Sequence, residues 1–272
     1  MGNRPRTASI HILDDDSLLH VFYLHGPFLL GEDEDENARL FGGNGRWVRG
    51  HWWFKLAHVC WRWRSVILRS ASYLGISLVG TYGISVANML AHSPPLPLVV
   101  DYSERNHDVT TEDEEGAILA LKHRDRVRRV RLRMPVTSPQ KLLGAMDEEY
   151  QFLEYLIIVP PDKDRSTILI LPETLQAPRL RHLTLAGFTL PIRLRLLTTA
   201  VGLVSLCLIM NDPSTYFHPN ALLHWLSFMP QLETLAVVFF TAIPNREILV
   251  ERRLTDMPTI TPVTLTISGL AV

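Results

Sequence analysis

The stretch Leu180-Arg181-His182-Leu183-Thr184-Leu185 has the pattern apolar-x-x-apolar-x-apolar, and the pattern recurs along the second half of the chain. Its alternation is typical of a β-strand, in which successive side chains point to opposite faces. Five copies are present, with first positions at 127, 153, 180, 203 and 232. We therefore predict a series of related strands. The copies are Val127/Val130/Leu132, Leu153/Leu156/Ile158, Leu180/Leu183/Leu185, Leu203/Leu206/Leu208 and Leu232/Leu235/Val237.

Helices are predicted between these strands, at residues 114–123, 139–149 and 218–229. Pro139 and Pro219 suit the first turn of a helix, where the missing N–H of proline costs nothing. One strand and one helix per repeat, at separations of 26, 27, 23 and 29 residues, is typical of leucine-rich repeats, which have a period of roughly 20–29 residues.

Further strands are predicted at both ends of this array, at residues 75–78, 98–100 and 263–267. The fold class is therefore α/β, with residues 73–272 forming an irregular leucine-rich-repeat solenoid with a curved parallel sheet. The array ends on the apolar residues 269–272, whereas a solenoid needs a polar capping unit. We expect either a short member of such a family or a truncated chain.

Alternation along each strand sends the residues between the apolar positions to the opposite, concave face of the sheet. If the protein holds a client protein, this face is the expected binding surface. An ordinary solvent-facing or self-packed sheet face is an equally open alternative. The expected client-binding residues are Arg129, Arg131, Arg133, Tyr155, Ile157, His182, Thr184, Ser205 and Thr234, with Cys207 and Ala236 on the same face.

The first part of the chain, residues 9–72, has helical rather than repeat character. The run Leu13-Asp14-Asp15-Asp16-Ser17 supplies possible helix caps, so a helix should begin near Asp15. An acidic, glycine-containing loop is predicted at 26–50, because like charges and glycines disfavour a packed structure. A single aromatic helix is predicted over 52–68.

Two of these segments resemble the F-box family, which carries a short helix ending in Ile/Val-Phe and a Val-Cys-x-x-Trp-Arg element. The matching segments are 12–24, ending in Val21-Phe22, and 52–68, with Val59-Cys60-Trp61-Arg62-Trp63-Arg64. The likeness is greatest to the F-box proteins of mushroom-forming (basidiomycete) fungi. It implies docking on a Skp1-type adaptor. The residues it implies for the docking face, or for the helices' own small core, are Leu13, Leu18, Leu19, Val21, Phe22, Val59 and Trp63.

Composition restricts the class of protein. A chain of 272 residues with 47% hydrophobic and 20% charged residues can bury a core, and its net charge of -1 gives no overall attraction to nucleic acid or anionic membranes. Cys60 and Cys207 are too few for a disulfide scaffold. Residues 1–12 lack the apolar segment of a signal peptide, and no apolar run is long enough to span a membrane. A cytoplasmic or nuclear location is expected.

Other chemistries are weakly supported. The six arginines within 124–133 alternate with core positions and lack an aromatic stacking platform, so nucleic-acid binding is not favoured. His51, His58 and Cys60 have no second ligand pair at zinc-site spacing. No phosphate loop or nucleophile elbow occurs. We expect no enzyme, cofactor or metal.

The resemblance and the repeats together predict the substrate-recognition adaptor of a Skp1–cullin–F-box ubiquitin ligase, with a Skp1-type adaptor and an unidentified client as partners. The alternative is a standalone repeat scaffold with a decayed F-box. Two features favour it: Asp14 stands where the family usually has proline, and the 26–50 loop is longer than the usual connection.

Overall fold

The computed structural model describes residues 12–25, 52–80, 83–102, 110–133, 139–159, 169–210, 216–239 and 264–269. The described residues fall into two compact units, and the boundary between them along the chain lies between Leu78 and Val79. We call the first the helical unit and the second the sheet unit. The acidic loop predicted at 26–50 lies outside the described residues.

The helical unit contains α1 (Asp15–His25), α3 (Trp52–Ala57) and α4 (Trp61–Arg69). The predicted start of α1 is confirmed. The single helix predicted over 52–68 is wrong, because Cys60 adopts an extended conformation (φ -161°, ψ 169°) and separates α3 from α4. Neither glycine nor proline marks this break, so apolar periodicity alone runs through it.

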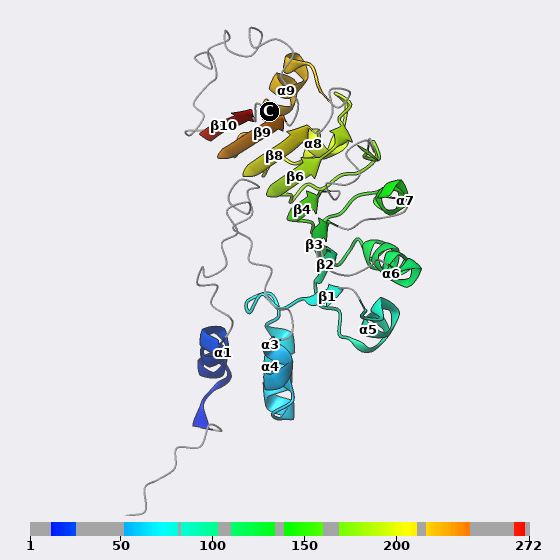
Figure 1. The fold of residues 1–272 in the computed structure, drawn as a ribbon. Helices are drawn as coiled ribbons and strands as arrows, with labels where there is room; N and C mark the ends of the chain where they lie inside the picture. Colours follow the sequence, from blue (N-terminus) through cyan, green and yellow to red (C-terminus); the bar gives the residue numbers. More distant parts are fainter. Residues whose placement is uncertain are drawn as a thin grey trace, which may run out of the picture. The chain divides into compact units, whose positions relative to one another are not determined.

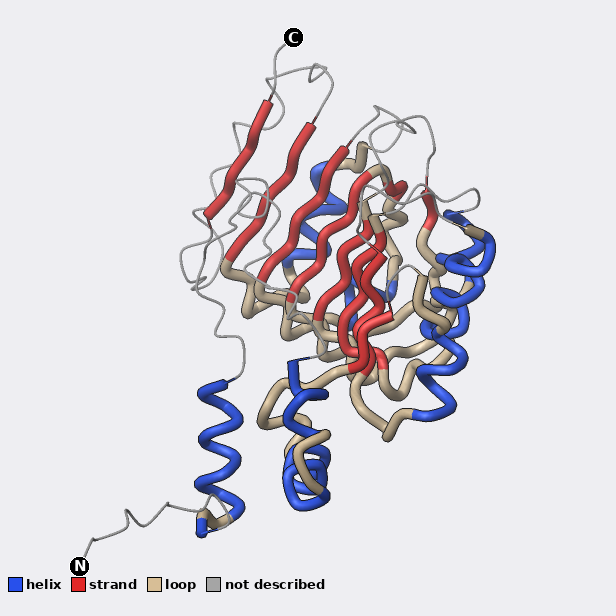
Figure 2. The backbone as a smooth tube through the Cα atoms, turned by 60° about the horizontal axis from the view of Figure 1, so that its bottom comes forward, coloured by secondary structure: helices blue, strands red, loops and turns tan. Residues whose placement is uncertain are grey.

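The sheet unit contains an eight-stranded sheet in which strands follow chain order, β1-β2-β3-β4-β6-β8-β9-β10. The pairings from β2 to β10 are parallel, and Figure 2 shows neighbouring strands of the sheet side by side. The predicted α/β class with a parallel sheet is confirmed. The strand bounds are β1 Leu78–Gly80, β2 Leu98–Tyr102, β3 Val127–Leu132, β4 Tyr155–Ile158, β6 His182–Ala186, β8 Ser205–Met210, β9 Thr234–Phe239 and β10 Thr264–Gly269, and a separate pair joins β5 Leu169–Ile170 to β7 Phe188–Thr189.

The second and third positions of all five predicted copies lie in this sheet and are aligned with one another, whereas the first positions of four copies, Leu153, Leu180, Leu203 and Leu232, lie two residues before their strands begin. The second apolar positions form one continuous row across five strands, and the third positions form a second row. Every residue of both rows is buried. The alignment explains why the pattern recurs, since the apolar side chains of each strand pack beside those of the next strand. The rows are Val130-Leu156-Leu183-Leu206-Leu235 and Leu132-Ile158-Leu185-Leu208-Val237.

Short helices occupy the connections between strands, and α5, α6 and α7 lie along one side of the sheet (Figure 1). A capping box formed by Thr110 and Asp113 begins α6, and Pro219 lies in the first turn of α9, as predicted. The helix predicted over 139–149 ends earlier, at Gly144. The bounds are α5 Val86–His92, α6 Thr111–Leu121, α7 Pro139–Gly144, α8 Arg195–Thr199 and α9 Pro219–Leu226.

Side chains also form hydrogen bonds with the backbone of segments about 30 residues away in the chain. The Trp225 indole donates to the carbonyl of Ile192, 33 residues earlier, and the Tyr150 hydroxyl donates to the carbonyl of Leu121, 29 residues earlier. The Gln140 amide both donates to and accepts from the backbone of Ile170, 30 residues later. Each separation is close to the spacing of the apolar pattern, so these bonds join neighbouring strand-and-helix segments.

Candidate functional site

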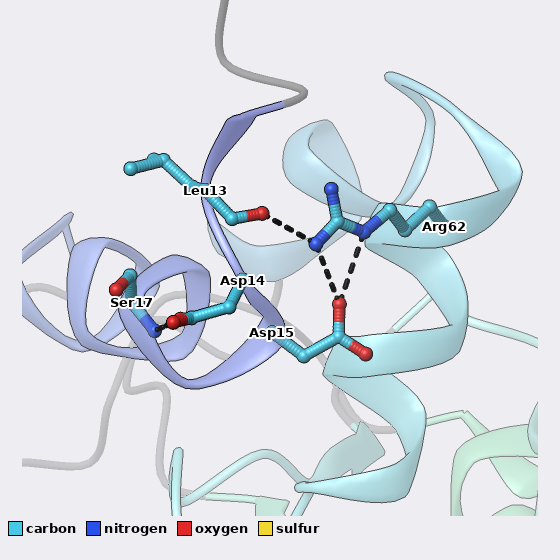
Figure 3. A network of polar contacts seen from close by, with 5 residues as sticks. All are labelled: Leu13, Asp14, Asp15, Ser17 and Arg62. Atoms are coloured by element: carbon cyan, nitrogen blue, oxygen red, sulfur yellow. Dashed lines mark hydrogen bonds and ion pairs between the residues drawn. The ribbon is translucent and has the colours of Figure 1, made fainter.

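The entry into α1 is held by a polar network within the helical unit (Figure 3). Asp14 Oδ1 accepts from the backbone N–H of Ser17 at 2.7 Å, which caps the helix. This backbone hydrogen bond lowers the pKa of Asp14. Arg62 of α4 donates from Nε (3.0 Å) and Nη2 (2.8 Å) to Asp15 Oδ1, and from Nη2 to the Leu13 carbonyl (2.6 Å). One guanidinium therefore ties the start of α1 to α4.

Two of the residues predicted to dock on an adaptor belong to the protein's own interior. Leu18 and Phe22 are fully buried, and the Phe22 ring meets the edge of Trp63 with 4.8 Å between ring centroids. As the chain stands, neither side chain can be presented to a partner. Of the two roles implied for these positions, the docking face or the helices' own small core, Leu18 and Phe22 take the second in this structure.

The remaining predicted docking residues keep some exposure. Leu13, Leu19, Val21 and Trp63 are half-buried, and Val59 is 58% exposed. They retain surface that a partner could cover. Exposure alone does not make them a site, because single apolar residues are common on protein surfaces.

The helical unit also exposes apolar residues that the motif comparison did not select. Trp61 is 79% exposed at the first position of α4, and Leu24, Tyr23 and Tyr73 are exposed as well. The rings of Tyr23 and Tyr73 lie 5.7 Å apart between centroids. The clustering of tryptophans in the sequence was the available signal, but which of them faces outward depends on the break at Cys60.

The second candidate surface is the alternate face of the sheet, which we define as the face carrying the residues between the buried apolar rows. Arg129, Tyr155 and His182 are neighbours in register on β3, β4 and β6. The guanidinium carbon of Arg129 lies 4.4 Å from the centroid of the Tyr155 ring. The Tyr155 and His182 rings are stacked at 4.4 Å with an interplanar angle of 10°. We call these three residues the ring stack.

The surroundings of the ring stack favour the neutral form of its histidine. Nδ1 of His182 is buried and has no hydrogen-bond partner among the described residues. Burial lowers the pKa of His182, and the nearby Arg181 and Arg129 lower it further. A neutral imidazole avoids placing an unpaired N–H and a positive charge at this position. The formal charge of the stack is therefore that of Arg129.

The other residues predicted on this face differ in accessibility. Arg131, Arg133 and Ile157 are half-buried, and Thr234 is exposed. Thr184 and Ser205 are buried, so they are not available for direct contact with a client. This corrects the prediction for these two positions, because alternation fixes the face of a side chain but not whether neighbours cover it.

A buried apolar cluster occupies another part of the same face, formed by Ala186, Cys207, Ile209 and Ala236 with Val159 and Val238 packed against it. Burial raises the pKa of the Cys207 thiol to about 12. A protonated, buried thiol is unreactive. Neither Cys60 nor Cys207 forms a disulfide bond.

Within the described ranges, no group of three or more His, Cys, Asp or Glu side chains is arranged to hold a metal ion. No helix in the same ranges combines the length and the apolar character needed to cross a membrane. Comparison of the chain with protein-family models, with curated proteins and with solved structures gives no match.

Proposed function

We propose that the protein is a non-catalytic adaptor of the Skp1–cullin–F-box type. In this proposal the helical unit is an F-box that docks on a Skp1-type protein, and the sheet unit is an irregular leucine-rich-repeat array that holds a client protein. Holding the client near a transfer enzyme raises its effective concentration, so the adaptor itself needs no catalytic residues.

The observation that carries the proposal is the apolar surface that the helical unit leaves exposed after its core is closed. Val59 and Trp61 lie within the Val-Cys-x-x-Trp-Arg element and are 58% and 79% exposed. A tryptophan combines a large contact area with little entropy loss on binding, which makes it a frequent anchor of interfaces. Covering these side chains would give a partner its binding energy.

The test is co-expression of the full chain with a Skp1 homologue, followed by co-purification. Removing the whole of α1 is a poor variant, because it removes Leu18 and Phe22 from the core. Val59→Asp is better, since its site is exposed in the free protein but would be buried in the complex. An unpaired buried carboxylate costs several kcal/mol, so affinity should fall by more than about tenfold.

Val201→Asp is the matched control. Val201 is 54% exposed and lies in the sheet unit, so the same substitution should leave the complex intact. Trp61→Ala is a second variant and should weaken the complex by loss of contact area. If the Val59 and Trp61 variants both co-purify as well as the wild type, the proposed docking surface is wrong.

The alternative is a standalone repeat scaffold whose F-box has decayed. The burial of both Leu18 and Phe22 favours it, because these apolar residues of α1 are consumed internally. In that case the wild-type chain stays folded and monodisperse but captures no Skp1 homologue. The same co-purification therefore separates the two functions.

A further inference from the structure

The alternate face of the sheet is positively charged around β3, although the chain as a whole is not. Among the described residues on strands β2 to β9, this face carries Arg129, Arg131 and one carboxylate, Asp101, which lies in register with Arg131. Arg133 continues the same alternation directly after β3. Three arginines and one aspartate give a formal charge of +2, against -1 for the entire chain. An acidic partner complements this surface.

Arg129 is the arginine on this face that is left for a ligand. Among the described residues it has no carboxylate within ion-pairing distance, whereas Arg128, on the opposite face of β3, pairs with Glu154 at 2.8 Å. Arg131 and Arg133 already make other contacts. Burial lowers the pKa of Arg129, as expected for a guanidinium that has lost part of its hydration.

The ring stack also holds this guanidinium in place. The contact with Tyr155 is made through the ring face, which uses none of the N–H donors of Arg129. Tyr155 is in turn supported by the stacked ring of His182. A guanidinium fixed in this way loses little further freedom on binding, and its donors match the two oxygens of a carboxylate.

We propose that the ring stack is the binding site for an aspartate or glutamate side chain in an acidic segment of a partner protein. The identification of that partner as a client rests on the proposed function. A nucleic acid fits less well, because it needs several basic contacts along its phosphates, and Arg129 is a single available cation. The proposed client is therefore a protein with an acidic peptide segment.

The test uses the full chain and a fluorescein-labelled, end-capped hexaglutamate peptide, with binding followed by fluorescence anisotropy. Hexaglutamine and a short oligothymidylate of similar charge are the comparison probes. We expect hexaglutamate to bind, hexaglutamine not to bind, and the oligonucleotide to bind more weakly than hexaglutamate. Added salt should weaken the binding, since the contact is between charges.

Arg129→Gln should reduce hexaglutamate affinity about tenfold, the effect expected for loss of one charge-assisted contact. Arg128→Gln makes the same change in net charge on the same strand and should leave the affinity within about twofold. Arg129→Lys keeps the charge and should lie between the wild type and Arg129→Gln. Thermal melting shows whether Arg129→Gln is folded. If it is not folded, Arg129→Lys still tests the proposal.

Equal losses for Arg128→Gln and Arg129→Gln, or no binding of hexaglutamate to the folded wild type, would overturn the proposal. So would oligothymidylate binding as tightly as the peptide. Capture of a Skp1 homologue by the same variants reports separately on the proposed function. Arg129→Gln should still capture it, while Val59→Asp should lose capture yet keep its affinity for hexaglutamate.

Discussion

Tyr150 shows how one side chain can join two segments that are about 30 residues apart in the chain. It is fully buried, and its hydroxyl donates to the carbonyls of Leu121 (2.8 Å) and Ala145 (3.3 Å). Tyr150→Phe keeps the ring but leaves both carbonyls without this donor. We expect the free energy of unfolding to fall by about 1–2 kcal/mol, measured by urea denaturation. Tyr73→Phe, at an exposed tyrosine, should change it by less than about 0.5 kcal/mol.

The same tyrosine predicts a loss of stability in alkali. Burial raises the pKa of Tyr150 well above its usual value. The stability from its neutral form is complete below the unfolded-state pKa of about 10, and it is lost progressively as pH rises above that value. The wild type should therefore lose more stability between about pH 9 and 11 than Tyr150→Phe does. Identical pH profiles would contradict this assignment.

The sequence allowed prediction of where residues face, but not of all their contacts. Alternation placed Arg129, Tyr155 and His182 on one face, and the structure brings them together. The stacking itself requires the register between strands about 27 residues apart and the rotation of each ring, which no local pattern contains. The burial of Thr184 and Ser205 likewise depends on what surrounds two small side chains.

At the scale of elements, predictions succeeded where a pattern repeats and failed where a single residue decides. The aligned apolar rows were predictable, because the apolar side chains in each copy of the pattern pack beside those of the neighbouring copy. The break between α3 and α4 was not, since the residue at the break is Cys60, which has no special preference for an extended backbone. The ends of α7 and β1 also differ from prediction by a few residues, as element boundaries often do.

The network around Arg62 predicts which change loosens α1 more. Arg62→Ala removes both the ion pair with Asp15 and the bond to the Leu13 carbonyl, whereas Asp15→Asn weakens the ion pair alone. The pair is partly exposed, so we expect about 0.5 kcal/mol for Asp15→Asn and about 1–1.5 kcal/mol for Arg62→Ala. Unfolding followed by tryptophan fluorescence measures both. Equal costs would show that the Leu13 bond contributes nothing.

For the whole molecule, the main structural fact is that the described chain contains two compact units. Each has buried apolar residues of its own: Phe22 and Ile67 in the helical unit, and the aligned rows in the sheet unit. Two cores of this kind can unfold separately, in which case no single unfolding transition describes the chain. The adaptor proposal assigns docking to one of these units and client binding to the other.

The tryptophans make this separation measurable. Trp52, Trp53, Trp61 and Trp63 lie in the helical unit, and Trp225 lies in the sheet unit. Tryptophan fluorescence therefore reports mainly the helical unit. Far-UV circular dichroism reports mainly the sheet unit, which contains most of the chain. We expect the two probes to give urea transitions with different midpoints.

Two core variants assign each transition to its unit. Leu206→Ala opens a cavity in a fully buried row and should cost about 2–5 kcal/mol, which moves the dichroism midpoint and leaves the fluorescence midpoint in place. Phe22→Leu removes the edge contact with Trp63, worth about 0.5–1.5 kcal/mol, and should move the fluorescence midpoint alone. If either variant shifts both midpoints equally, the units unfold as one body.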